Sequence, residues 1–80
     1  MSIMIKIPTY IIREESYRPD SKEKDWIIYF QFHSEPNLLS TRISLFHALQ
    51  FTKASAFDSG FSKSDVCIKS IDRHGKETIY

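Results

Sequence analysis

SLFHALQFTKASAFDSGF (residues 44–61) is followed by SKSDVCIKSI (62–71), DRHG (72–75) and KETIY (76–80). The first of these segments predicts one amphipathic helix. Its small and apolar residues recur with a 3.6-residue period and form a core stripe, which consists of Leu45, Ala48, Leu49, Thr52 and Ala56. Ser44 has the side chain of an N-cap, and Gly60 can adopt the left-handed conformation that ends a helix.

The rest of this helix predicts an exposed side and a surplus of phenylalanine. The positions opposite the core stripe are His47, Gln50, Ala54 and Asp58. Phe46 and Phe57 share one shoulder of the helix, and Phe51 lies on the other. We expect that the three rings cannot all face one sheet, because a helix buries only one stripe against its neighbour.

Beyond the helix, the pattern predicts a β-hairpin. Val66, Ile68 and Ser70 alternate with Cys67, Lys69 and Ile71, as in a strand. Asp72-Arg73-His74-Gly75 suits a type I turn that closes on a glycine bulge, with Asp72 accepting hydrogen bonds from turn amides. Residues 76–80 should pair back as a terminal edge strand.

Two or three strands are predicted before the helix. Residues 3–12 favour a strand, and Pro8 places it at a sheet edge or at a bulge. Residues 13–25 are a polar connection. Residues 26–33 form the strongest strand, with alternate residues, Trp26 to Phe32, on a core face and Ile27, Tyr29, Gln31 and His33 on a half-exposed face. Residues 38–43 are either a short strand or an irregular lead-in to the helix.

The expected fold is therefore a single α+β domain over residues 1–80, in the order ββ(β)αββ. One helix should pack on one face of a mostly antiparallel sheet of four or five strands. A chain of 80 residues is the size of one domain, and its 41% hydrophobic content is sufficient for a core.

Charge and cysteine content restrict the partners and the location. The net charge is +1, so long-range attraction to nucleic acid or to an anionic membrane is not expected. The single cysteine, Cys67, excludes an internal disulfide and suits a reducing cytosol. Lys6 and Pro8 interrupt the apolar N-terminal run, which we interpret as a strand and not as a signal peptide. We expect a cytoplasmic protein.

No pattern in the chain predicts catalysis, a metal or a cofactor. Cys67 lies in an apolar strand, whereas a reactive thiol needs a lowered pKa and exposure. His33, His47 and His74 do not match the paired spacings of zinc ligands. The carboxylates of Glu14, Glu15, Asp20, Glu23 and Asp25 fall in the polar connection, a solvated segment, whereas a general acid needs a carboxylate in a low-dielectric pocket. Both glycines are explained by a cap or a turn, so a phosphate-binding loop is not expected.

Nucleic-acid binding is the alternative that the basic residues leave open. It would use Lys63, Lys69, Arg73, His74 and Lys76, with Tyr80 stacking on a base. Nearby acidic residues balance these cations, and RNA-binding sheets carry a clear basic excess beside their aromatic residues.

The surplus of aromatic residues favours a protein interface, either with another protein or in a homodimer. Ile27 and Tyr29, with Tyr10 and Ile12, are expected on a sheet face that no helix covers. The predicted partner-binding residues are Tyr17, Arg18, Tyr29, His33, Phe46, Phe57, Arg73 and His74. Desolvated aromatic anchors at the centre, with charges at the rim, would occlude the partner's surface.

In size and layout, the chain resembles the small inhibitors encoded by phages and other mobile elements, anti-CRISPR proteins among them. The resemblance rests on one short domain, on the predicted order of strands and helix, and on the absence of catalytic motifs. It implies a non-enzymatic protein that sterically blocks a bacterial effector complex. These inhibitors share no common signature, so the resemblance assigns no residue. The near-neutral charge favours docking over DNA mimicry.

Overall fold

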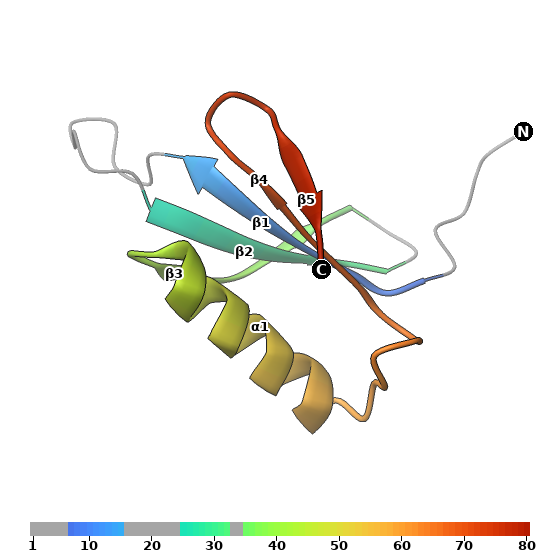
Figure 1. Ribbon diagram of the computed structural model, residues 1–80. Helices are drawn as coiled ribbons and strands as arrows, with labels where there is room; N and C mark the ends of the chain where they lie inside the picture. The colour runs from blue at the N-terminus through green and yellow to red at the C-terminus, as the bar shows by residue number, and fades with distance from the viewer. Residues whose placement is uncertain (1–6, 16–24, 33–34) are drawn as a thin grey trace, which may run out of the picture.

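The structure is a computed structural model that describes residues 7–15, 25–32 and 35–80. Over these residues, one helix packs on one face of a five-stranded sheet, which confirms the α+β prediction (Figure 1). The elements are β1 (Thr9–Glu15), β2 (Asp25–Gln31), β3 (Asn37–Arg42), α1 (Leu45–Asp58), β4 (Cys67–Ile71) and β5 (Glu77–Ile79). Residues 37–42 are thus a strand, not an irregular lead-in.

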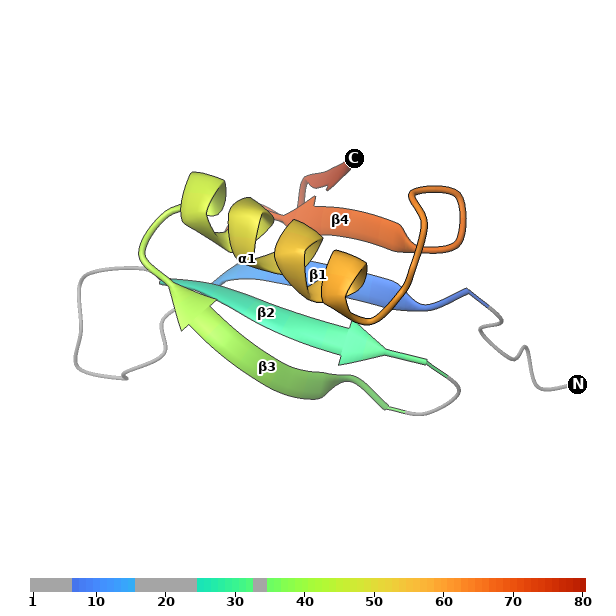
Figure 2. The same cartoon turned by 90° about the horizontal axis from the view of Figure 1, so that it is seen from below.

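The strand order across the sheet is β3-β2-β1-β4-β5. Three of the neighbouring pairs are antiparallel, and β1 and β4 are parallel, with Thr9 opposite Cys67. The sheet is therefore mostly antiparallel, as expected. The helix connects β3 to β4 and crosses one face of the sheet, over β2 and β1 (Figure 2). That crossing moves β4 to the far side of β1.

The prediction that Pro8 puts the first strand at a sheet edge or gives it a bulge is wrong. β1 is the central strand, between β2 and β4. Pro8 does not disrupt the ladder because it precedes the strand, and its carbonyl oxygen accepts a hydrogen bond from the amide of Cys67 at 2.9 Å. Residues 13–15 were expected in a polar connection, but they continue β1 and pair with residues 25–27 of β2.

The core lies between α1 and the even-numbered residues of β1, β2 and β4. Its buried members are Tyr10, Ile12, Ile28, Ala48, Ala56 and Ile68. The predicted helix stripe is confirmed, because Ala48, Thr52 and Ala56 are buried and Leu45 and Leu49 pack against the core. Thr52 fits in this stripe because its hydroxyl donates to the carbonyl oxygen of Ala48 at 2.8 Å.

The opposite sheet face differs from its prediction in two respects. Tyr10 and Ile12 were expected there, but they point toward the helix and belong to the core. Ile27 was expected to be half-exposed, yet only 4% of it is accessible, and Ile11 beside it is also buried. The alternation of β2 was correct for Trp26, Ile28 and Phe30, whereas Phe32 lies beyond the end of the strand and is exposed.

Both predicted helix ends are confirmed. Ser44 is the N-cap, and its Oγ accepts from the amide of His47 at 3.2 Å. At the C-terminal end, Gly60 has φ +81°, its amide donates to Phe57 O, and the amide of Phe61 donates to Ala56 O. These two bonds define a Schellman motif, which turns the chain back toward the sheet.

Candidate docking groove

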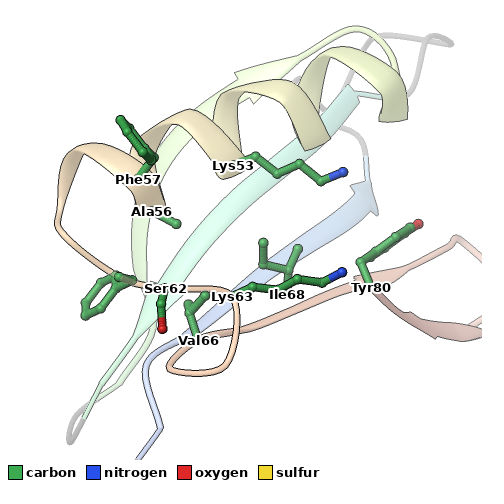
Figure 3. Close-up of a pocket in the computed structure, with 9 residues that line it drawn as sticks. Lys53, Ala56, Phe57, Ser62, Lys63, Val66, Ile68 and Tyr80 are labelled. Carbon is green, nitrogen blue, oxygen red and sulfur yellow. The ribbon is translucent and has the colours of Figure 1, made fainter.

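A groove of about 380 Å³ lies beside the C-terminal half of α1. It forms because α1 packs chiefly on β2, β1 and β3, so the helix side of β4 is left partly open. Figure 3 shows the side chains that line it. They are Lys53, Ala56, Phe57, Phe61, Ser62, Lys63, Val66, Ile68 and Tyr80. We call this surface the docking groove.

The lining of the docking groove is largely apolar. Ala56 and Ile68 are buried, and Val66 packs against the core. Phe61 stacks on Phe30 with 6.3 Å between ring centroids, and Phe30 lies 4.9 Å from Tyr10. This row of rings anchors one side of the groove to the core. The groove is thus lined in part by side chains that the fold itself holds in place.

The loop that closes the groove follows from local sequence. The Schellman motif at Gly60 ends the helix and turns residues 61–66 back toward the sheet, beside α1. A turn then forms at Ser62, whose carbonyl oxygen accepts from the amide of Asp65 and whose hydroxyl donates to the Asp65 carboxylate at 2.5 Å. The chain enters β4 at Cys67, so Val66 and Ile68 lie beneath the groove (Figure 3).

Two lysine side chains and a tyrosine lie at one end of the groove. The side chains of Lys53 and Lys63 extend in the same direction, toward the end where Tyr80 lies (Figure 3). The Tyr80 hydroxyl is 2.8 Å from the Oγ of Ser70, which holds the ring in place. Among the described residues, Lys69 forms an ion pair with Glu77. By contrast, no carboxylate of these residues lies within 4.0 Å of the ammonium group of Lys53 or Lys63. Both ammonium groups are therefore available to an anionic partner.

One exposed stripe of α1 borders the groove. Phe46, Gln50, Lys53 and Phe57 are exposed and follow each other at helical spacing, and we call them the helix shoulder. Phe46 is 65% accessible and Phe57 is 81% accessible. At a rise of 1.5 Å per residue, the two rings start about 16 Å apart along the axis. Phe57 belongs to both the helix shoulder and the docking groove.

Phe51 does not contribute to this surplus. It packs against the core, and the guanidinium of Arg42 lies 4.5 Å from the centroid of its ring. The Arg42 side chain also donates to the carbonyl oxygen of Thr41 at 2.7 Å. Phe46 and Phe57 remain exposed, which confirms the prediction that the three rings cannot all face the sheet.

Tyr29, another predicted partner-binding residue, lies on the opposite face of the sheet. Its hydroxyl donates to Glu15 Oε1 at 2.5 Å. This hydrogen bond, together with burial and the negative charge of Glu15, raises the pKa of Tyr29 to about 12. A hollow of about 240 Å³ lies here, lined by Ile11, Arg13, Glu15, Tyr29 and Pro36.

Arg73 and His74 occupy the turn between β4 and β5, which has the predicted geometry. Gly75 has φ +83°, and Asp72 Oδ1 accepts from the amides of Lys76 at 3.0 Å and His74 at 2.8 Å. These hydrogen bonds, that from Lys76 first, lower the pKa of Asp72. The amide of Arg73 donates to Glu14 Oε1 at 3.0 Å, which ties the turn to β1.

The predicted partner-binding residues therefore do not form one site. Tyr29 lies on the open face of the sheet, Arg73 and His74 lie in the turn, and Phe46 and Phe57 lie on the helix shoulder. Tyr17, Arg18 and His33 lie outside the described residues. Of the groove residues, Phe57 was predicted to bind a protein, and Lys63 and Tyr80 were considered only for nucleic-acid binding. The groove itself was not predicted, because the parallel pairing of β4 with β1 brings Ile68 and Tyr80 beside the end of the helix.

The candidates for catalysis and metal binding are also dispersed. Glu14 and Glu15 were expected in a solvated loop, but they lie in β1 and accept hydrogen bonds from Arg73 and Tyr29. Cys67 is a free, partly buried thiol. No three histidine, cysteine or acidic side chains gather as a metal site within residues 7–15, 25–32 and 35–80. In the same residues, no helix is long and apolar enough to cross a membrane.

The basic residues considered for nucleic-acid binding do not share one surface. Lys63 lines the docking groove on the helix side of the sheet. Lys69 lies on the opposite side of β4, since side chains alternate along a strand, and it pairs with Glu77 at 3.6 Å. Arg73, His74 and Lys76 are in or next to the turn. The basic residues therefore do not form one patch, whereas the exposed apolar residues of the groove and the helix shoulder adjoin each other.

Comparisons of the chain with models of protein families, with curated proteins and with solved structures find no match. A function for this chain is therefore inferred from the geometry of its described residues alone.

Proposed function

We propose that this chain is a non-enzymatic, cytoplasmic module that binds another protein through the docking groove and the helix shoulder. The observation that carries the proposal is the 81% accessible Phe57 at the margin of an apolar groove of about 380 Å³. A phenylalanine that the core does not need, placed beside an apolar recess, is typical of a binding anchor.

The resemblance to small phage and mobile-element inhibitors suggests what such binding achieves. On this proposal, the helix shoulder covers a functional surface of a bacterial effector complex and blocks it sterically, as in anti-CRISPR inhibition. The net charge of +1 supports docking on a protein surface over imitation of DNA, which needs a strongly acidic surface. A single cysteine, left free, suits the reducing cytoplasm.

Site-specific photocrosslinking in the native cells tests the proposal. A photoreactive phenylalanine analogue such as p-benzoylphenylalanine is placed at Phe57, at Phe46 and, as a control, at the exposed Arg13 on the other side of the sheet. We expect Phe57 and Phe46 to yield one covalent adduct of the same mass, because both would contact the same partner.

The control and a nuclease treatment separate the competing functions. An adduct of equal yield at Arg13 would show nonspecific contact, and absence of any adduct at Phe57 would contradict protein docking. An adduct that disappears after nuclease digestion would favour the nucleic-acid alternative. A protease-sensitive, nuclease-resistant adduct supports the proposed function.

A further inference from the structure

We infer that the docking groove receives an acidic peptide segment, in which one large apolar side chain fills the groove and neighbouring carboxylates meet Lys53 and Lys63. The inference rests on the proposed function and specifies the chemistry of the partner. Three observations lead to it: the apolar lining, the two ammonium groups that pair with no carboxylate of the described residues, and the continuity of the groove with the helix shoulder.

The apolar lining determines what enters the groove. Ala56, Val66 and Ile68 present only hydrocarbon, and Phe57 and Phe61 add two rings. A leucine or phenylalanine side chain of the partner would exchange water for contact with these surfaces, which is the main favourable contribution at an interface anchor. A polar side chain would lose its hydration there without gaining a hydrogen bond.

The charge at the groove determines what flanks that side chain. Lys53 on α1 and Lys63 on the returning loop extend toward the same end (Figure 3). The carboxylate in this loop is that of Asp65, which accepts a hydrogen bond from Ser62 and forms no ion pair with either lysine. Carboxylates of a partner would therefore complement both ammonium groups, and the attraction should weaken with salt.

The position of the groove favours a polypeptide over a small amphiphile. It opens onto the helix shoulder, where Lys53 and Phe57 are exposed and Gln50 and Phe46 continue the surface along α1. A chain that leaves the groove can therefore make further contacts along the helix. A free fatty carboxylate would fill the groove but would not use this adjoining surface.

Fluorescence anisotropy with defined peptides tests the inference. The labelled peptide contains Glu-Asp-Leu-Phe-Asp-Glu, and two matched peptides replace either the acidic residues by their amides or Leu-Phe by Ala-Ala. We expect binding of the first peptide only. Raising the salt concentration should weaken its binding, since the ammonium groups are exposed.

Matched variants of the protein locate the binding. Lys53→Glu combined with Lys63→Glu should weaken the acidic peptide about tenfold, because each exposed charge pair contributes a fraction of the binding and reversal makes it repulsive. Phe57→Ala should cause a loss of about tenfold as well. Lys76→Glu and Ile43→Ala are the controls, since they change an exposed cation and an exposed apolar side chain outside both the groove and the helix shoulder. Neither should alter the affinity of so short a peptide.

Amide chemical shifts of the labelled protein complete the test. Binding in the groove should shift the amides of residues 56–68 and of Tyr80. Shifts confined to β3 or to the open sheet face, equal binding of the amide peptide, or a fatty acid found by native mass spectrometry would overturn the inference. If the acidic peptide fails while Phe57 still crosslinks to a protein, this inference is wrong and the proposed function stands. If both fail, both are wrong.

Discussion

Two side chains, Tyr29 and Asp72, have altered pKa values because each is hydrogen-bonded in the folded chain. Tyr29 donates to Glu15 across the β1–β2 pair, and Asp72 accepts from two amides of the β4–β5 turn. Neither interaction involves the docking groove. The two hydrogen-bonded groups therefore affect the stability of the fold and not the groove. The pH dependence of that stability can be tested separately from binding.

The raised pKa of Tyr29 predicts a loss of stability in alkali. The pKa is about 12 in the folded chain against a normal value of 10.0, so the stabilisation is fully present below pH 10 and is lost as the pH rises through about 12. Tyr29→Phe removes the titrating hydroxyl. We expect the difference in unfolding free energy between wild type and Tyr29→Phe to shrink over this interval, measured by urea denaturation. A constant difference would contradict the hydrogen bond.

The lowered pKa of Asp72 predicts the opposite dependence. Its contribution is present above the unfolded value, near 3.8, and is lost as the pH falls through the lower folded value. Asp72→Ala should therefore speed hydrogen exchange of the His74 and Lys76 amides at neutral pH. At a pH below the folded value, the wild type and the variant should exchange alike. Equal exchange at neutral pH would show that Asp72 does not hold the turn.

At the scale of elements, the end of α1 determines where the groove forms. Gly60 has φ +81°, which an L-residue adopts only at a cost, and a Cβ at this position would meet nothing within 4 Å. The Schellman bonds of Gly60 and Phe61 then place the returning loop beside the helix. The backbone conformation of one glycine thus sets the position of Lys63 and Val66.

We expect Gly60→Ala to lower the free energy of unfolding by about 1–2 kcal/mol through backbone strain alone. Gly60→Asn should cost less, because asparagine tolerates the left-handed region. Ser59→Ala, an exposed neighbour, serves as the control and should change stability by less than about 0.5 kcal/mol. Urea denaturation measures all three. If alanine and asparagine cost the same, or if alanine is neutral, the cap does not have the described geometry.

The sequence was sufficient to predict elements whose signals are local. The N-cap Ser44, the core stripe of α1, the cap at Gly60 and the Asp72–Gly75 turn are confirmed because each depends on residues within a few positions. The predicted edge position of β1 was wrong. Pro8 confines a strand to an edge only if a neighbouring strand needs the hydrogen bond that its missing amide cannot donate. It precedes the strand, so a partner on each side of β1 was possible.

At the scale of the whole molecule, the docking groove could not be predicted because it depends on strand order. Lys53 and Lys63 are ten positions apart, and Tyr80 is further still, and nothing in the local pattern indicates that β4 pairs with β1 in parallel. The exposed Phe57 could be predicted from helical periodicity, since it falls outside the core stripe. The sequence thus indicated the anchor, and the topology supplied the groove beside it.

The most direct test of protein docking uses the partner protein that crosslinking identifies. Its co-purification is compared, without crosslinking, between the wild type and the double variant Phe46→Ala, Phe57→Ala. Both rings are exposed, so unfolding free energy should change little and folding should be preserved. An interface anchored on these rings predicts that the partner co-purifies with the wild type and is lost from the folded double variant. Retention of the partner at wild-type yield would contradict the claim that the groove and the helix shoulder form the binding surface.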